Sequence, residues 1–259
     1  MIITQIIKYK FIKLALVWFD EINVKDVDVK ADIYFFVHLD RLKSANNIGG
    51  RTYLDKTAFS DLTLDEDDLF AKIEKNSRYK IKRALREGFQ HKIFDSSQML
   101  EQNDRLLEFE KEYNRMFSQK DQSSELNMEE MRQLIANGAL YFSMAFFEDQ
   151  PVVYHVYVRS GCKIRLLHSV SIYREAAAND MRAMIARYNR CLHWQDMSHF
   201  KKQGCDVYDW GGIGESEEFA NINEFKLSFG GDIVDSYRRV CPRTILGRMI
   251  TPIYCLLPR

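Results

Sequence analysis

The sequence has no long hydrophobic run and no excess of charge of either sign. Its apolar N-terminal stretch, residues 2–19, is interrupted by Lys8, Lys10 and Lys13, so it does not reach the roughly 18 apolar residues that a membrane span needs. It also lacks a small-residue cleavage site, and we expect a cytoplasmic protein whose N-terminus forms a strand and a helix packed on the body. Lysine and arginine total 37, as do aspartate and glutamate, so no global field favours nucleic acid or a membrane as partner.

Cysteine chemistry is sparse as well. The five cysteines are widely spaced, without a CxxC pair and without a histidine at metal-ligand spacing. We therefore expect reduced thiols, no metal and no tightly bound cofactor. No spacing assembles a Ser-His-Asp or Cys-His arrangement, so the sequence indicates no covalent nucleophile.

Hydrophobic residues make up 46% of the 259 residues, enough for the core of one or two domains. Residues 32–39 are rich in β-formers and predict a buried strand, followed by a turn at 46–50 and a returning strand over 51–59. Thr63 and Glu66 have the spacing of a capping box and predict the start of a helix.

A basic helix is predicted next. Its cationic residues recur every three or four positions and form one stripe, opposite an apolar face. The stripe consists of Lys75, Arg78, Lys82 and Arg86, and the apolar face of Ile81, Ala84 and Leu85. Such a stripe is either a solvated face or a ridge that binds the phosphates of a nucleotide, a lipid pyrophosphate or a tRNA. In the second interpretation, Lys82 and Arg86 contact the substrate.

The rest of the chain predicts helix, helix, three strands, long helix, strand, helix and strand. Helical patterns cover residues 96–117 and 128–138, strand patterns cover 140–147, 152–158 and 164–170, and a long helix covers 179–200. This order predicts a mixed α+β architecture.

Two nearby segments predict a binding site. Residues 208–213, YDWGGI, indicate a buried strand that ends in a glycine turn, and residues 223–231, NEFKLSFGG, indicate a helix with an aromatic-lysine pair and a glycine stop. Gly211 and Gly212 allow a ligand to approach the backbone, and Lys226 supplies a mobile cation.

These segments resemble the C-terminal part of the FemABX proteins, the peptidoglycan bridge peptidyltransferases within the wider GNAT acyltransferase superfamily. Residues 76–88 resemble the basic helix that precedes the last acyltransferase domain of that family, and the resemblance covers about residues 61–240. It implies an α+β fold with a GNAT-like mixed, twisted sheet flanked by helices. FemABX proteins typically have two such domains, so we expect one domain and a remnant here. The expected division is a strand-rich N-terminal remnant (1–60), a basic connector (61–95), a GNAT-like domain (96–240) and a C-terminal tail (241–259).

The resemblance also implies a donor-binding loop between the third strand and the long helix, residues 171–179. In the superfamily this loop binds the donor's pyrophosphate through backbone amides at the helix N-terminus. Arg174 matches the first position of the superfamily's usual sequence pattern for this loop. Ala177 and Asn179 depart from it, because they occupy the two positions where glycine or another small residue is usual. Because the match is only partial, the resemblance leaves two donors open, acyl-CoA and aminoacyl-tRNA. It implies Arg174 and Asn179 as donor-binding residues in either case.

For the reaction centre, the resemblance assigns Phe225 to the donor's terminal adenosine and Lys226 to the charge that develops at the reacting ester. A fixed cation beside that carbonyl fits the physics of acyl transfer. The alternative is an ordinary amphipathic helix with Phe225 in the core and Lys226 in water. Asp209 either orients an acceptor amine or holds the glycine turn.

The C-terminal segment, residues 237–259, has five arginines and no acidic residue, interleaved with apolar residues. It packs on the N-terminal apolar segment or rests on an anionic membrane surface. Its prolines at 242, 252 and 258 predict that it is not one long helix.

Taken together, the patterns and the resemblance predict an acyltransferase that moves an aminoacyl or acyl group onto an amine or hydroxyl of a nucleotide- or lipid-linked cell-wall or surface-polysaccharide precursor. One alternative is an acyl-CoA-dependent N-acyltransferase acting on a nucleotide-linked amino sugar. A third hypothesis, from a different class, is a non-catalytic binding module with the same fold, which would bury Phe225 and Lys226 away from any cleft.

Overall fold

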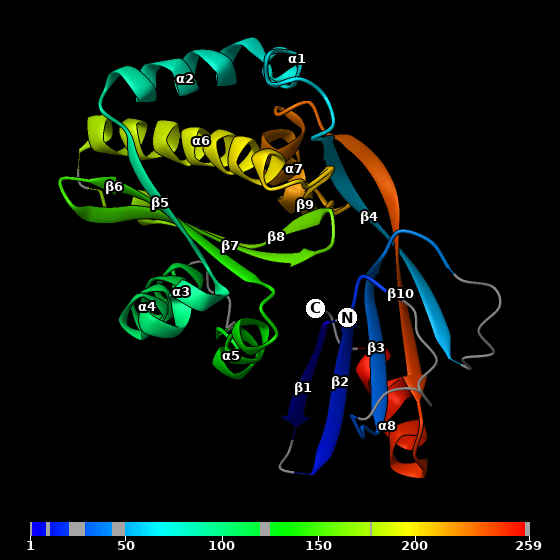
Figure 1. Cartoon of the computed structure of the whole chain (residues 1–259). Coiled ribbons are helices and arrows are strands. Elements are labelled where there is room, and N and C mark those ends of the chain that lie inside the picture. The colour runs from blue at the N-terminus through cyan, green and yellow to red at the C-terminus, as the bar shows by residue number, and fades with distance from the viewer. Residues whose placement is uncertain are drawn as a thin grey trace.

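The computed structural model describes residues 2–8, 11–20, 29–42, 50–119, 125–176 and 178–256. One mixed sheet of ten strands runs through the molecule in the order β1-β2-β3-β10-β4-β9-β8-β7-β6-β5. Helices cover both faces of its β5–β9 half (Figure 1). This is the α+β fold expected from the sequence.

The strands are β1 (Ile2–Lys8), β2 (Ile12–Trp18), β3 (Ile33–Leu39), β4 (Arg51–Asp61), β5 (Gln90–Asp95), β6 (Leu140–Phe147), β7 (Gln150–Ser160), β8 (Lys163–Ser171), β9 (Val207–Gly212) and β10 (Asp232–Pro242). The helices are α1 (Glu66–Lys72), α2 (Lys75–Arg86), α3 (Ser96–Glu101), α4 (Asn103–Ser118), α5 (Met128–Ala136), α6 (Asn179–Lys202), α7 (Ala220–Leu227) and α8 (Ile245–Leu256). Two short 3₁₀ turns, Ile172–Arg174 and Glu217–Phe219, precede α6 and α7.

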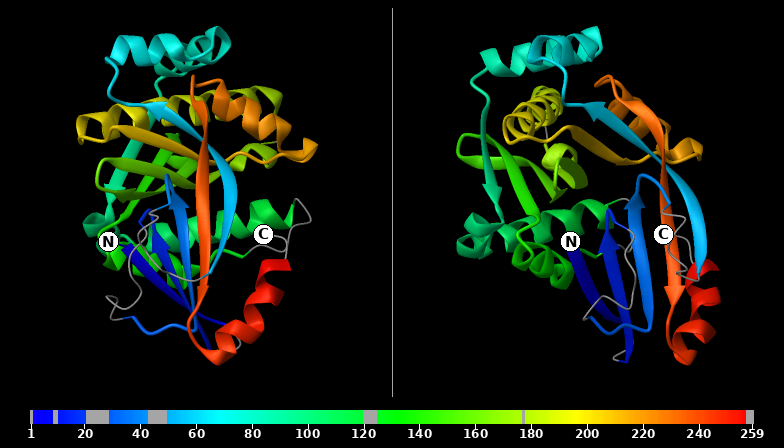
Figure 2. Two further views of the ribbon diagram at one scale, coloured as in Figure 1. Left: turned by 90° about the vertical axis from the view of Figure 1, so that its right-hand side faces the viewer. Right: turned by 45° about the vertical axis from the view of Figure 1, so that its right-hand side comes forward.

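The first three strands correct two expectations. Residues 2–8 and 12–18 form two antiparallel strands, β1 and β2, and not a strand and a helix, because their apolar residues pair across the two strands. Strand β4 does not return along β3, because β10 lies between them and pairs antiparallel with both. Figure 2 shows β4 and β10 running side by side across the molecule. The predicted turn at 46–50 falls largely on 43–49, which lie outside the described residues.

The second half of the sheet has the layered order predicted from sequence. Helix α6 lies on one face of β6–β8 and α2 packs on its outer side, while α3, α4 and α5 cover the other face (Figure 1). Two large apolar clusters fill the space on either side of the sheet. Strand β9 lies sixth in the order, and α6 and α7 share the same apolar cluster, as predicted.

Two local predictions were wrong. Thr63 bonds the Asp61 side chain and does not cap α1, whose N-cap is Asp65 without a side-chain cap bond. Leu85 is exposed on α2, while Ile81 and Ala84 are buried. The C-terminal segment is not one long helix, as predicted, because its first residues belong to β10 and α8 begins only at Ile245, although Pro252 lies within α8.

No helix among the described residues is long and apolar enough to cross a membrane. Helix α8 packs with one face on β3 and β10.

Candidate functional site

The site is built where two parallel strands separate. Strands β8 and β9 pair through only three residue pairs, the last of which joins Arg165 to Asp209. Beyond that pair β8 continues to Ser171 and leads through the first 3₁₀ turn into α6, while β9 ends at Gly212. The carboxyl ends of parallel strands are a common place for ligands in α/β sheets.

Gly211 adopts a left-handed backbone, with φ of +82°. A Cβ atom there would lie 3.3 Å from the Leu166 carbonyl oxygen and 3.9 Å from Lys226 Nζ. Glycine therefore allows β9 to turn close to β8 and to the lysine.

Asp209 is fully buried and holds this turn. Its Oδ1 accepts from the Gly211 amide at 2.9 Å and lies 2.5 Å from Thr57 Oγ1, while its Oδ2 accepts from Arg165 Nη1 at 2.7 Å. Burial raises the pKa of the Asp209 carboxyl, but Arg165, Lys163 and the two hydrogen bonds more than offset this and hold the pKa below its ordinary value. The buried carboxylate thus holds the glycine turn, and its predicted contact with an acceptor amine stays a prediction.

Lys226 reaches this cluster from α7. Its Nζ donates to the carbonyl oxygen of Gly212 at 2.6 Å. Burial, and then the positive charge of Arg165, lower the pKa of Lys226 to about 8, although Asp209 acts in the opposite direction. The residue is therefore a half-buried cation that titrates close to physiological pH.

Phe225, the neighbour of Lys226, packs at the edge of the core. Its ring lies 5.5 Å from those of His193 and Phe229 and 4.9 Å from the Arg190 guanidinium carbon. The ring is only partly buried, so this packing does not take it entirely out of solvent.

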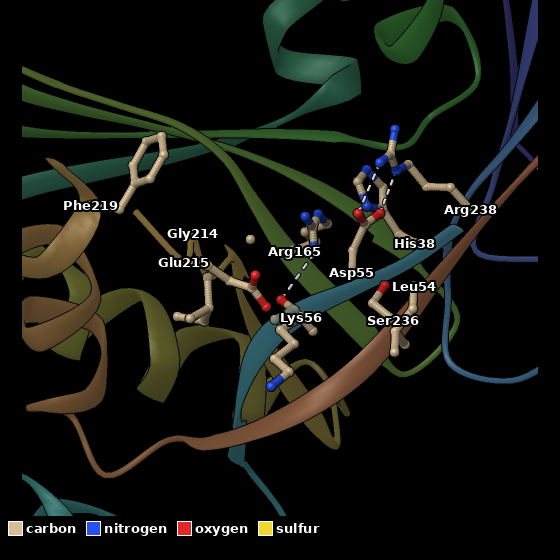
Figure 3. A pocket seen from close by; sticks show the side chains of 13 residues that line it. His38, Leu54, Asp55, Lys56, Arg165, Gly214, Glu215, Phe219, Ser236 and Arg238 are labelled. Carbon is tan, nitrogen blue, oxygen red and sulfur yellow. Dashed lines mark hydrogen bonds and ion pairs between the residues drawn. The ribbon is translucent and has the colours of Figure 1, made fainter. Parts of the chain in front are cut away.

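A pocket of about 660 Å³ lies next to the Gly211–Gly212 turn, with Gly212 in its lining. It is lined by His38, Leu54, Asp55, Lys56, Thr57, Arg165, Gly212, Ile213, Gly214, Glu215, Phe219, Ser236 and Arg238. Figure 3 shows Arg238 and Asp55 facing each other beside His38, with Arg165 reaching toward β4. Arg165, Thr57 and Gly212 thus belong both to the pocket and to the Asp209 cluster. The walls carry charges of both signs beside the apolar Leu54 and Phe219.

The structure brings together four of the residues expected from sequence, Asp209, Gly211, Gly212 and Lys226. Phe225 lies beside Lys226 on α7, and the others lie elsewhere. Lys82 and Arg86 are exposed on α2, with Lys82 Nζ 5.4 Å from the centre of the Phe70 ring. Arg174 is exposed and donates to the Gln119 carbonyl at 3.2 Å, and Asn179 is the exposed first residue of α6. Ala177 lies outside the described residues.

Sequence reasoning missed Thr57 and Arg165. Arg165 follows Lys163 by two residues in β8 and is buried because it pairs with Asp209, a pairing that the sequence does not show. Thr57 gave no signal either, because threonine is common in strands and its partner Asp209 is 152 residues away.

A second polar cluster is buried behind the site, around Asp196 of α6. Asp196 Oδ2 accepts from Ser143 Oγ at 2.9 Å and from the Tyr157 hydroxyl at 2.6 Å, and lies 2.8 Å from His155 Nδ1. The Tyr157 hydroxyl is also 2.7 Å from that of Tyr208 in β9. The cluster ties α6 to the central strands.

Ligand atoms of His155, His193 and Asp196 lie within 4.8 Å of one another, a spacing that a metal site would need. However, the two rings stack face to face, with centroids 3.9 Å apart and an interplanar angle of 23°. A metal lies in the plane of each imidazole that binds it, so nearly parallel stacked rings cannot both direct a lone pair at one ion. His193 Nδ1 is 2.9 Å from the Tyr208 hydroxyl, and burial, then the charges of His155 and its cationic neighbours, place the pKa of His193 well below its ordinary value. The geometry is that of a hydrogen-bonded network, and the absence of a metal stays a prediction.

The fold is shared with solved structures of low sequence identity. FemX is 12% identical, with a TM-score of 0.58 over 86% of this chain and 68% of FemX. The C-terminal domain of a proposed lysylphosphatidylglycerol synthetase from Agrobacterium fabrum is 14% identical, with a TM-score of 0.56 over 86% of this chain and 72% of that chain. L-PGS from Bacillus licheniformis is also 14% identical, with a TM-score of 0.53 over 88% of this chain and 74% of that one. The sequence matches no protein-family model and no curated protein. The chain therefore shares the fold of FemX, as the resemblance to the FemABX proteins predicted.

Proposed function

We propose that this protein is an acyltransferase that moves an aminoacyl or acyl group onto an amine or hydroxyl of a cell-wall or surface-polysaccharide precursor. The observation that carries the proposal is the position of Lys226. Its Nζ bonds the Gly212 carbonyl where β8 and β9 separate, and Gly212 itself lines the 660 Å³ pocket. A half-buried cation beside an open glycine turn is suited to stabilising negative charge.

In the proposed reaction an acceptor amine or hydroxyl attacks the donor's carbonyl carbon. The carbonyl oxygen becomes an oxyanion, the leaving group departs with the bonding electrons, and the acceptor loses its proton to solvent or to the leaving group. The Lys226 ammonium stabilises the oxyanion, and no covalent enzyme intermediate is required. Asp209, Arg165 and Thr57 fix the turn on which this geometry depends. The pocket, with its mixed charges and apolar walls, holds the acceptor.

The donor's phosphates are proposed to lie at the N-terminus of α6, with Arg174 and Asn179. The support is positional, because the 3₁₀ turn with Arg174 and the first turn of α6 directly follow β8. A donor longer than coenzyme A, such as aminoacyl-tRNA, would also reach Lys82 and Arg86 on α2, the helix that packs on α6. Phe225 is proposed to position the donor end.

The test is a transfer assay with acetyl-CoA, longer acyl-CoAs and aminoacyl-tRNA as donors, and nucleotide-linked amino sugars and peptidoglycan nucleotide precursors as acceptors. With the active pair, Lys226→Met is expected to lower kcat by about 10²-fold or more, as for the loss of one oxyanion donor. Phe225→Leu is expected to raise KM for the donor more than it lowers kcat.

A matched control is Lys201→Met, since Lys201 Nζ also donates to a backbone carbonyl, that of Leu62 at 2.9 Å. It should retain the wild-type kcat. Wild-type turnover by Lys226→Met under saturating donor and acceptor would remove Lys226 from the reaction. No turnover by the wild type with any of these donors and acceptors would favour a non-catalytic module. Activity with acyl-CoA alone, on an amino sugar, would favour the N-acyltransferase alternative.

A further inference from the structure

Helix α8 has two apolar faces, and only one of them packs on the protein. The inner face includes Leu246 and Ile250, which lie against the apolar cluster that contains β3 and β10. The outer face carries Ile245 and Met249, which are one helical turn apart and 79% and 70% exposed. Exposed apolar side chains in a contiguous arc, unlike single ones, mark a surface that another body covers.

The exposed charged side chains on and just before α8 are arginines. Arg248 lies on the same exposed arc and Arg243 lies two residues before the helix, and both are exposed. The sequence from residue 237 to 259 has five arginines and no acidic residue. The Asp32 carboxylate lies at the start of α8, where its two oxygens accept from the Lys13 amide and from the Thr244 hydroxyl. Among the described residues, neither Arg243 nor Arg248 forms an ion pair with a carboxylate.

The helix is held in this orientation by its own contacts. The Thr244 side chain accepts from the Gly247 amide at 2.9 Å and caps the first turn. Gly247 lies against β3, since a Cβ atom there would be 2.2 Å from the Asp32 carbonyl oxygen. Because α8 cannot rotate about its axis without losing this close approach, Ile245, Arg248 and Met249 stay directed outward.

We propose that the outer face of α8 docks on an anionic lipid surface. An apolar arc flanked by arginines matches the boundary between acyl chains and phosphate headgroups, where apolar side chains enter the bilayer and guanidinium groups bind phosphates. A protein partner would also cover the apolar arc, but the one-signed charge favours a surface that is uniformly negative. This inference does not depend on the proposed acyltransferase activity.

The test is cosedimentation of the full chain with vesicles. Equal parts of phosphatidylglycerol and phosphatidylcholine should bind the protein, and pure phosphatidylcholine should not. Arg243→Gln and Arg248→Gln should each weaken binding about fivefold, and Ile245→Glu with Met249→Glu should weaken it about tenfold or more. Leu100→Glu is the matched control, because Leu100 is 69% exposed on α3, on another part of the molecule, and it should bind as the wild type does.

Circular dichroism melts should show that all these exposed variants remain folded. The proposal is overturned if the wild type does not bind, if it binds both vesicles equally, or if Leu100→Glu loses as much binding as the α8 variants. It is also overturned if sedimentation velocity shows a dimer that Ile245→Glu dissociates, since a second copy would then be the occupant.

Discussion

The surroundings of Lys226 oppose its charge and lower its pKa to about 8. Burial and Arg165 disfavour the ammonium, while Asp209 and the Gly212 carbonyl retain it. A group balanced in this way changes charge near pH 8, where a free lysine would not. The proposed mechanism therefore predicts in which direction kcat changes as the pH rises.

If the ammonium stabilises the oxyanion, kcat should fall as the pH rises through about 8, because the cation is lost above its pKa. The Lys226→Arg variant should show no decline in kcat near pH 8, whatever the size of its kcat, since a guanidinium stays charged. The measurement is kcat at saturating substrates from pH 6 to about 9.5. A rate that instead rises through this range would assign the neutral amine as a base and contradict the oxyanion role.

At the scale of single elements, a glycine turn follows α7, the helix that carries Lys226. Gly230 has φ of +76°, and a Cβ atom there would lie 2.6 Å from Lys72 Cβ and 2.7 Å from the Lys72 carbonyl oxygen. The chain between α7 and β10 therefore passes directly over the end of α1. Glycine is needed for two reasons, the left-handed backbone and the contact.

Gly230→Ala is expected to lower the free energy of unfolding by about 1 to 2 kcal/mol from the backbone and by about 1 to 3 kcal/mol more from the contact. Gly88→Ala separates these causes, because Gly88 has φ of +80° with nothing within 4 Å of its Cβ position. Urea unfolding of the two variants measures the difference. Equal losses would show that the contact with Lys72 contributes nothing.

At the scale of the whole molecule, side chains of α5 and its C-cap bond the outer edge of β1, in addition to the sheet that joins the N-terminal strands to the rest of the protein. Gln133 of α5 donates to the Gln5 carbonyl at 2.7 Å and accepts from the Gln5 amide at 2.5 Å. Asn137 donates to the Ile3 carbonyl at 3.3 Å. The outer edge of β1 is thereby covered, which protects it from pairing with another chain.

Gln133→Ala should speed amide hydrogen exchange in β1 and β2 and leave β6 to β9 unchanged, because it removes two hydrogen bonds worth about 1 kcal/mol each. Exchange followed by mass spectrometry gives this segment by segment. Arg132→Ala is the control, since Arg132 is the exposed neighbour on the same helix. Faster exchange throughout the sheet would mean that the N-terminal strands do not open separately.

Much of the architecture followed from local sequence patterns. The strands of 140–171, the long helix α6 and the glycine-ended strand β9 were all predicted, because apolar periodicity and glycine stops act over a few residues. The pairing of Gly211 and Gly212 with Lys226 was also within reach, since these residues are separated by one turn and one helix.

Contacts between distant segments were decided only by the tertiary structure. Pairing of residues 51–61 with β3 or with β10 would satisfy the same backbone groups, so local sequence does not decide between them. In the structure β10 lies between β3 and β4 and pairs with both. Thr57, Arg165 and Asp209 meet only because β4, β9 and β8 become neighbours. Periodicity fixes which face of a strand is buried, but it does not encode the neighbour that the buried face or edge will meet, so the charges that tune Lys226 could not be found from the sequence.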